Sequence, residues 1–118
     1  MANMGASIIG FTNQYTQNVS WHIVWEFRVA EEKREEFERA YRANGDWAQL
    51  FARAKGFSGT TLLRDPAIAG RYVTLDVWES VEAFDKFKRE FADKYKELDL
   101  HCEDLTEYEM KIGAFETL

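Results

Sequence analysis

The chain has 118 residues and a formal net charge of −6, and 46% of its residues are hydrophobic and 15% aromatic. This length suits one domain with one core, and the aromatic content excludes a disordered or low-complexity protein. An acidic chain without a cluster of Lys and Arg is a poor ligand for phosphate backbones, so we expect no nucleic-acid binding.

Location and domain organisation follow from what the composition lacks. Cys102 is the only cysteine, so no intrachain disulfide can form. No apolar run approaches the roughly 20 residues that span a bilayer, and the N-terminal segment lacks the basic start of a signal peptide. We therefore expect a cytoplasmic protein that does not bind membranes. Residues 1–20 are rich in Asn, Gln, Ser, Thr and Gly, which predicts an extended arm before a single domain over residues 21–118.

The first half of the domain changes from strand to helix periodicity. Residues 21–29 alternate between apolar and mixed side chains, as a strand with one apolar face does. Residues 31–42 are helix formers with apolar residues three and four apart, and an Asn-Gly pair ends this helix. Asp46 is placed to begin a short second helix, with Gln49 three residues later as in a capping box.

The second half contains three more strands and a long helix. Residues 57–64 and 71–78 flank a turn that closes at Gly70, which predicts an antiparallel hairpin. Ser80 is placed to cap a helix whose apolar residues recur every three or four positions, and we expect a break near Asp99. Residues 106–115 alternate again and predict the last strand. The fold class is therefore α+β, a ferredoxin-like βαββαβ domain with a four-stranded antiparallel sheet.

The helices of such a domain cover only one face of its sheet. From the alternation along the strands, we predict that the other face carries four large apolar side chains, namely Val24, Leu62, Tyr72 and Trp78. Burying each of them is worth roughly 1.5–3 kcal/mol. A second copy of the sheet is the simplest cover, which predicts a homodimer that forms a dimeric α+β barrel. A monomer whose N-terminal arm folds over this face is the alternative.

Residues 72–84, Tyr-Val-Thr-Leu-Asp-Val-Trp-Glu-Ser-Val-Glu-Ala-Phe, resemble the antibiotic biosynthesis monooxygenase family of dimeric α+β barrels. In that family a strand ends in Trp-Glu-Ser, and the next helix opens with Glu-Ala-Phe. Gly56-Phe57-Ser58-Gly59 and Ile112-Gly113-Ala114-Phe115 are also similar to family positions. The resemblance implies the predicted fold. It leaves several activities open, because the family includes cofactor-free oxygenases of polycyclic phenols, haem-degrading enzymes and members without an assigned activity.

Haem degradation is disfavoured by the same resemblance. The haem-degrading members share an Asn, a Trp and a His at positions that are occupied here by Phe27, Phe87 and Glu97. His101 could replace the missing axial ligand only if the register shifted. The adjacent residues His101-Cys102-Glu103 point in different directions on a helix, and no second cluster completes a metal shell, so we expect no metal and no cofactor.

A cofactor-free oxygenase needs a dry apolar slot and a base near the acidic hydrogen of its substrate. The aromatic residues expected between sheet and helices are Trp25, Phe27, Phe51, Phe84, Phe87, Phe91 and Tyr95. Plain core packing explains the same pattern. The candidate bases on the strands are His22, Glu26 and Asp76, although the alternation places Glu26 and Asp76 on the opposite face, where a paired interface network is the competing interpretation.

These observations predict one of two functions. The first is a cofactor-independent monooxygenase that acts on a small aromatic or quinol-like substrate. The alternative is a non-catalytic homodimeric module that binds a small hydrophobic ligand or a partner in the same slot.

Overall fold

The structure, a computed structural model, describes residues 19–118. The predicted N-terminal arm lies outside the described residues except for Val19 and Ser20. The backbone N–H of Ser20 donates a hydrogen bond of 2.8 Å to the Oγ1 atom of Thr117. The N–H of Thr117 in turn donates one of 3.1 Å to the carbonyl of Ser20. The start of the domain is therefore bonded to its C-terminal end.

Four strands form one antiparallel sheet with the spatial order β2-β3-β1-β4. The strands are β1 (Trp21–Arg28), β2 (Phe57–Arg64), β3 (Arg71–Trp78) and β4 (Tyr108–Glu116). With the helices that follow β1 and β3, this is the ferredoxin-like βαββαβ arrangement. The predicted fold class is confirmed, and the bounds of β2 and β3 agree with the two strands predicted around the turn.

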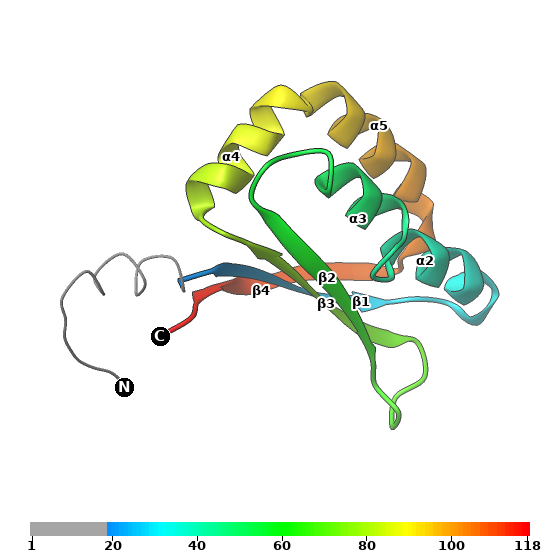
Figure 1. Cartoon of the computed structure of the whole chain (residues 1–118). Coiled ribbons are helices and arrows are strands. Elements are labelled where there is room, and N and C mark those ends of the chain that lie inside the picture. Colours follow the sequence, from blue (N-terminus) through cyan, green and yellow to red (C-terminus); the bar gives the residue numbers. More distant parts are fainter. Residues whose placement is uncertain (1–18) are drawn as a thin grey trace, which may run out of the picture.

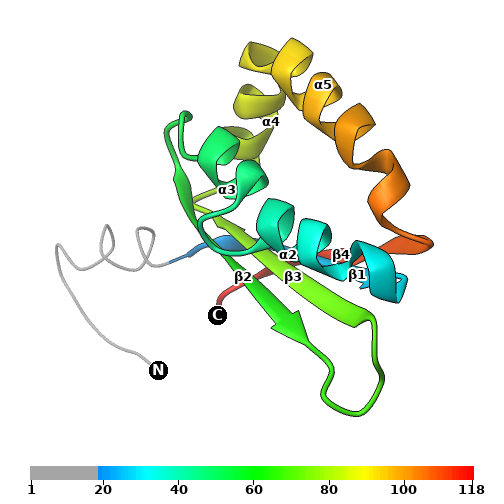
Figure 2. The ribbon, with the colours of Figure 1, turned by 90° about the vertical axis from the view of Figure 1, so that its right-hand side faces the viewer.

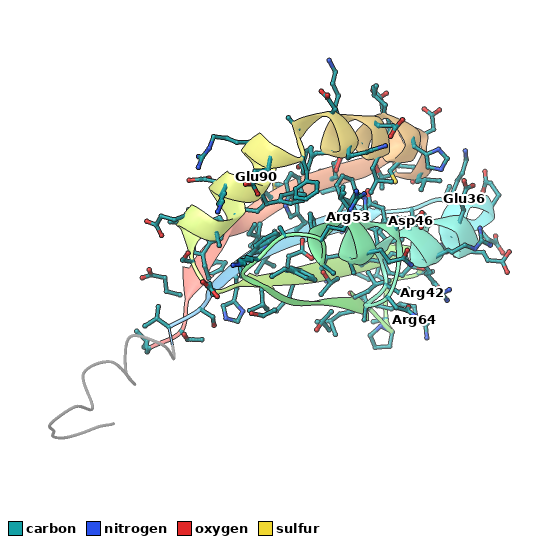
Figure 3. All side chains as sticks on the ribbon, turned by 45° about the horizontal axis from the view of Figure 1, so that its top comes forward. Glu36, Arg42, Asp46, Arg53, Arg64 and Glu90 are labelled. Carbon is teal, nitrogen blue, oxygen red and sulfur yellow. The ribbon has the colours of Figure 1, made fainter. Side chains whose placement is uncertain are left out.

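All described helices lie on one face of the sheet (Figures 1 and 2). One group consists of the 3-10 helix η2 (Glu31–Lys33), α2 (Arg34–Tyr41) and α3 (Asp46–Phe51). The other consists of α4 (Val81–Glu90), α5 (Ala92–Cys102) and the 3-10 helix η3 (Glu103–Leu105). Charged side chains such as Glu36 and Glu90 are exposed on the outer side of these helices (Figure 3). No helix within residues 19–118 has the length and apolar composition needed to cross a membrane.

The ends of the helices agree only in part with the predictions. The Oγ atom of Ser80 accepts a hydrogen bond of 3.1 Å from the N–H of Ala83, so the predicted cap is confirmed. The predicted capping box at Asp46 is wrong, because the side chain of Gln49 donates to the carbonyl of Asn44 instead. The long helix is also interrupted earlier than predicted. Phe91 leaves the helical conformation at φ −114°, ψ 28° and separates α4 from α5.

Gly70 is required where the β2–β3 hairpin meets the end of β1. Its φ is +84°, a conformation that favours glycine, and a Cβ atom there would lie 2.5 Å from the carbonyl oxygen of Val29. The carbonyl of Gly70 accepts a hydrogen bond of 2.8 Å from the N–H of Val29. This close backbone contact fixes the hairpin beside the start of the first helices.

The core lies between the helices and the sheet, and its centre is aromatic. The most buried large side chains are Phe37, Tyr72, Trp78 and Phe87. The ring of Trp78 lies 5.2–5.5 Å from the rings of four phenylalanines, two of them on α4. Edge-on and tilted ring pairs at this spacing add to the stabilisation from burial.

The pairing of the strands corrects the predicted face of β2 and β3. Residues opposite each other on antiparallel strands point to the same side of a sheet. Tyr72 pairs with Phe27 and Trp78 with Trp21, so both point toward the helices. Leu62, which pairs with Thr74, also packs against this core. The prediction that Leu62, Tyr72 and Trp78 lie on the uncovered face is therefore wrong, and only Val24 of that set lies there.

The uncovered face, called the open face below, is nevertheless apolar. Strand pairing places on it Val24, Leu63, Val73, Leu75, Val77, Tyr108, Met110 and Phe115. Several of these side chains are well exposed, including Phe115 at 53% and Leu63 at 50%. In β2 and β3 both faces carry apolar residues, so the alternation alone did not decide which set the helices cover.

Candidate functional site

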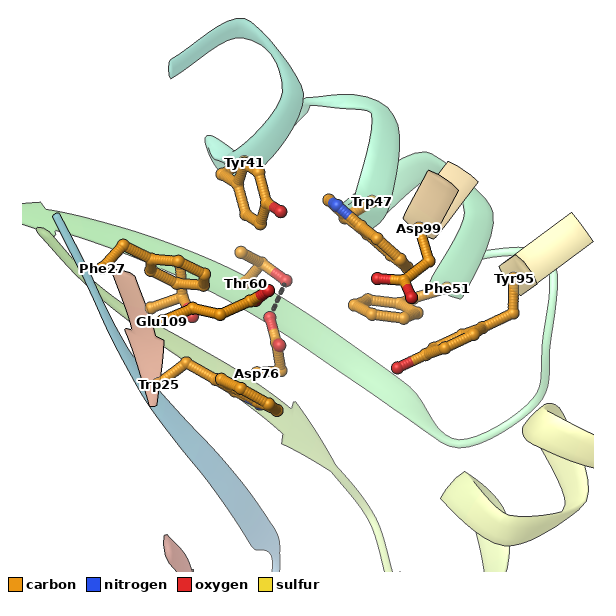
Figure 4. Close-up of a pocket in the computed structure, with 11 residues that line it drawn as sticks. Trp25, Phe27, Tyr41, Trp47, Phe51, Thr60, Asp76, Tyr95, Asp99 and Glu109 are labelled. Atoms are coloured by element: carbon orange, nitrogen blue, oxygen red, sulfur yellow. Dashed lines mark hydrogen bonds between the residues drawn. The ribbon is translucent and has the colours of Figure 1, made fainter. Parts of the chain in front are cut away.

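A cavity of about 80 Å³ lies between the sheet and the helices (Figure 4). Every strand of the sheet contributes to its lining, together with α2, α3 and α5. Its aromatic walls are Trp25, Phe27, Tyr41, Trp47, Phe51 and Tyr95. Its polar lining consists of Thr60, Thr74, Asp76, Asp99 and Glu109. The cavity therefore combines a mainly aromatic surface with carboxylic acids from three separate elements.

Asp76 is the least exposed acid of this cavity. It pairs across the sheet with the buried Ile23, so its side chain points toward the helices. The hydroxyl of Thr60 donates a hydrogen bond of 2.6 Å to Oδ1 of Asp76 (Figure 4). Burial raises the pKa of Asp76 from 3.8 to about 6, while the bond from Thr60 acts in the opposite direction. The carboxylate is thus mostly ionised at neutral pH and is a stronger base than an exposed aspartate.

Asp99 and Glu109 stand where the cavity meets solvent, because both side chains are exposed. Asp99 comes from α5 and Glu109 from β4, on opposite sides of the opening (Figure 4). Partial burial raises the pKa of Glu109, and the nearby charge of Asp99 raises it further. The two acids therefore make the mouth of the cavity electronegative.

The wall formed by α2 and α3 contains the hydroxyl of Tyr41 and the indole N–H of Trp47, with the thiol of Cys102 from α5 nearby. Burial raises the pKa of the Tyr41 hydroxyl above its usual value, and burial also raises the pKa of the neighbouring Cys102 thiol to about 11. Both groups are therefore protonated at neutral pH. The indole N–H of Trp47 is buried and makes no hydrogen bond of good geometry within residues 19–118, but it lies near the Tyr41 hydroxyl and the Cys102 thiol and acts to lower the pKa of both groups, against the effect of burial. Figure 4 shows the nitrogen-bearing edge of Trp47 turned toward Tyr41.

The other two candidate bases lie on the open face. The ring Nε2 of His22 is 3.0 Å from the hydroxyl of Ser20. Glu26 accepts hydrogen bonds from Arg71 at 2.7 Å and from Arg28 at 3.4 Å, and the Arg71 guanidinium holds the pKa of Glu26 below its usual value. Of the three acids and bases predicted from the strands, only Asp76 is next to the cavity.

The predicted aromatic slot divides into two parts. Four of its residues, Trp25, Phe27, Phe51 and Tyr95, line the cavity. Phe84, Phe87 and Phe91 do not, and for them the prediction is wrong. Phe87 is fully buried against Trp78, Phe51 and its neighbours on α4, so these three residues belong to packed aromatic core.

Several residues of the site differ from the sequence-based predictions in identity or in orientation. Thr60 and Thr74 were not predicted, and Asp76 was predicted as a base but on the opposite face; all three face the cavity because β2 and β3 present the opposite face to the one predicted. The alternation in Thr74-Leu75-Asp76 favours the opposite orientation, with Leu75 toward the helices, and only the pairing with β1 places Thr74 and Asp76 there. Asp99 and Glu109 carried no recognisable signal, because both lie in segments where charged residues are frequent.

The positions that correspond to those of the haem-degrading enzymes in the family that the sequence resembles do not form such a site here. Phe27 lines the cavity, whereas Phe87 is in the core and Glu97 and His101 are exposed on α5. Among residues 19–118, no group of three or more His, Cys, Asp or Glu side chains is arranged to hold a metal ion.

Comparisons with known proteins agree with this architecture. The family model for antibiotic biosynthesis monooxygenases matches residues 21–98. A variant of SnoaB, a cofactor-independent oxygenase from Streptomyces nogalater, is 27% identical with a TM-score of 0.57, over 81% of this chain and 90% of that chain. A protein from Nitrosomonas europaea, described as a putative antibiotic biosynthesis monooxygenase, is 16% identical with a TM-score of 0.64, over 86% of this chain and 92% of that chain.

A similar protein from Bordetella bronchiseptica, with the same description, is 19% identical with a TM-score of 0.61 and is covered over 97% of its length. Among curated protein sequences, none matches this chain. The family model covers well over half of the chain, and it contains β1, β2, β3 and most of the lining of the cavity. The chain belongs to the antibiotic biosynthesis monooxygenase family.

Proposed function

We propose that this protein is a cofactor-independent monooxygenase, and that Asp76 is the base that accepts the hydroxyl proton of a small aromatic or quinol-like substrate. The observation that carries the proposal is a carboxylate with a pKa of about 6 beside an aromatic cavity. The 27% identity to SnoaB, a cofactor-independent oxygenase, supports the same reaction class.

The reaction requires only the substrate and O2. Asp76 removes the proton of a phenolic hydroxyl, and the resulting phenolate gives one electron to O2 to form a phenoxyl radical and superoxide. These two species join to form a carbon–oxygen bond. One oxygen atom of O2 becomes a new carbonyl of the quinone, and the other leaves as water with the ring hydrogen and the proton held by Asp76. The aromatic walls exclude bulk water from the anion, which makes the carboxylate a more effective base.

Oxygen consumption by the Asp76→Asn variant tests this proposal. With a one-ring or a two-ring dihydroquinone, we expect the wild-type rate to exceed the buffer rate and to rise with pH through about 6, as Asp76 ionises. Asp76→Asn should lower the rate at least about 100-fold, the usual contribution of a positioned base. The control Asp85→Asn removes an exposed acid of α4 and should leave the rate unchanged. Equal rates in wild type and Asp76→Asn exclude Asp76 as the base.

A second function, a non-catalytic module that binds a small hydrophobic ligand, is favoured by the mainly aromatic lining of the cavity. Its volume of about 80 Å³ is near half of the ~150 Å³ known to admit benzene in a protein core. Either function therefore requires the cavity to widen before a whole aromatic ring can enter. If ligands bind while no dihydroquinone is oxidised above the buffer rate, this second function replaces the first.

We also propose that the protein works as a homodimer that buries the open face. Proteins of this family are commonly dimeric. Leu63, Met110 and Phe115 are each about half exposed, and a second sheet packed on them would remove this apolar area from water. A cytoplasmic location stays a prediction, which cell fractionation can check.

A further inference from the structure

All ionisable groups with a formal charge that line the cavity are acidic. Its lining includes the carboxyl groups of Asp76, Asp99 and Glu109 but no lysine, arginine or histidine. Within residues 19–118, none of these three acids forms an ion pair, and only Asp76 accepts a side-chain hydrogen bond. Carboxylates that are partly desolvated and lack a counter-charge attract a cation and repel an anion.

The aromatic walls favour the same sign of charge. Six aromatic rings line the cavity, and the faces of such rings attract ammonium groups. The chain already shows this contact on its surface, where Nζ of Lys88 lies 5.2 Å from the centre of the Tyr95 ring. Tyr95 also belongs to the cavity wall. Rings and carboxylates together are the groups that bind organic cations.

A second, independent observation indicates a polar ligand. Trp47 is 8% exposed and lines the cavity, and its indole N–H makes no hydrogen bond of good geometry within residues 19–118, although it lies near the Tyr41 hydroxyl and the Cys102 thiol. A buried donor whose hydrogen bonds are poorly made is unfavourable, because folding has removed its hydrogen bond to water. The indole N–H of Trp78 also lacks an acceptor, but Trp78 is not part of the cavity lining. A ligand oxygen in the cavity would satisfy Trp47.

The three acids lie at different depths in the cavity. Asp76 lies beside the buried Thr60 and Thr74 at the sheet, whereas Asp99 and Glu109 are exposed at the mouth. A ligand with a hydroxyl at one end and a positive charge at the other therefore meets a matching group at each end. The small volume favours one ring over a larger ring system, because even one ring requires the cavity to widen.

We propose that the cavity selects single-ring phenols that carry an ammonium group, with the phenolic hydroxyl directed to Asp76 and the ammonium group at Asp99 and Glu109. The position of the hydroxyl rests on the proposed function. The selection by charge does not, because it depends on the mouth of the cavity and can be measured without any reaction.

Three phenols of similar size and different charge provide the test: tyramine, para-ethylphenol and para-hydroxyphenylpropionate. Their dissociation constants are measured without oxygen from the quenching of tryptophan fluorescence, since Trp25 and Trp47 line the cavity. We expect tyramine to bind at least 10-fold more tightly than the propionate, with the neutral phenol between them. Equal affinities, tighter binding of the propionate, or no binding of any probe at millimolar concentration would overturn the proposal.

The double variant Asp99→Asn with Glu109→Gln assigns the selection to the mouth. It should bring the affinities for tyramine and the propionate to within 2-fold of each other and leave that for para-ethylphenol unchanged. The control Glu107→Gln removes an exposed acid just before β4 that does not line the cavity, and it should retain the full preference. If the control loses the preference equally, overall charge and not the mouth is responsible.

Binding of the three phenols and oxidation of dihydroquinones, measured together, separate this proposal from the proposed oxygenase activity. Selective tyramine binding without oxygen consumption by dihydroquinones keeps the charge selection and removes the oxygenase. Oxidation of dihydroquinones that depends on Asp76, together with equal binding of all three phenols, keeps the oxygenase and removes the charge selection.

Discussion

Two acids on opposite faces of the sheet, Asp76 and Glu26, differ in their surroundings and in the direction of their pKa shifts. Glu26 on the open face is bonded to two arginines, and the stronger of these bonds lowers its pKa. Asp76 under the helices has one neutral partner, Thr60, and burial raises its pKa to about 6. The paired acid is suited to holding strands or subunits together. Asp76, which has no ion-pair partner, is suited to accepting a proton, because its charged form is only partly stabilised.

The largest expected difference between the two faces concerns packing. Phe87→Ala removes a fully buried ring from the core under the helices and should lower the free energy of unfolding by about 3–5 kcal/mol. Phe115→Ala removes a ring that is 53% exposed on the open face. In a monomeric sample, this second change should cost less than about 1 kcal/mol. Urea denaturation of both variants measures the contrast, and similar losses would contradict the assignment of the two faces.

The open face is expected to control self-association. Leu75 lies in the middle of this face between Val24 and Thr61, so Leu75→Glu places a charge where a partner would bury it. We expect the dissociation constant of the dimer to rise at least about 100-fold. The matched control Val81→Glu makes the same kind of change on an exposed valine of α4. Sedimentation velocity measures both, and a wild-type protomer that stays alone at high concentration would contradict the dimer.

The smallest expected effect is the pH dependence of stability, which differs between Asp76 and Glu26. Because the pKa of Asp76 is raised from 3.8 to about 6 on folding, the native state keeps a proton that the unfolded state loses in this range. The contribution of Asp76 to stability is therefore most favourable below pH 4 and falls by about 2–3 kcal/mol as the pH rises to 6 and above.

The variant Asp76→Asn should remove this fall. Its stability relative to wild type should be near zero at pH 4 and should reach a gain of about 2 kcal/mol at pH 7. Urea denaturation at a series of pH values provides the measurement. Glu26→Gln serves as the opposite case, since the lowered pKa of Glu26 stabilises the native state above the usual pKa and loses that effect in acid. A constant difference between Asp76→Asn and wild type at all pH values would show that Asp76 is not desolvated.

The sequence sufficed for the fold but not for the orientation of two strands. The hairpin was predictable because Asp65, Pro66 and Gly70 determine a turn, and the element order follows from the change in periodicity. In β1 one face is clearly apolar, and Trp25 and Phe27 lie on the side of the sheet that the helices cover. In β3 both alternating sets, Tyr72 with Trp78 and Val73 with Val77, are apolar, and only the pairing with β1 decides between them.

The candidate site depends on that choice. Asp76 lies beside the cavity only because β2 and β3 direct Thr60 and Asp76 toward the helices. The local pattern of polar and apolar residues alone does not determine this orientation. The acids at the mouth depend on still longer-range geometry. Asp99 and Glu109 meet across the cavity because α5 passes over the sheet toward the start of β4, and no spacing in the sequence encodes that distance.

The interruption at Phe91 makes one wall of the cavity adjustable. Tyr95 and Asp99 lie on α5, while α4 contributes no residue to the lining and is held by the Ser80 cap and the buried Phe87. Cys102 is the only fully buried residue of α5, and Tyr95 and Leu98 are partly buried against the core. We therefore expect an incoming ring to displace α5 before it displaces the carboxylate on the sheet.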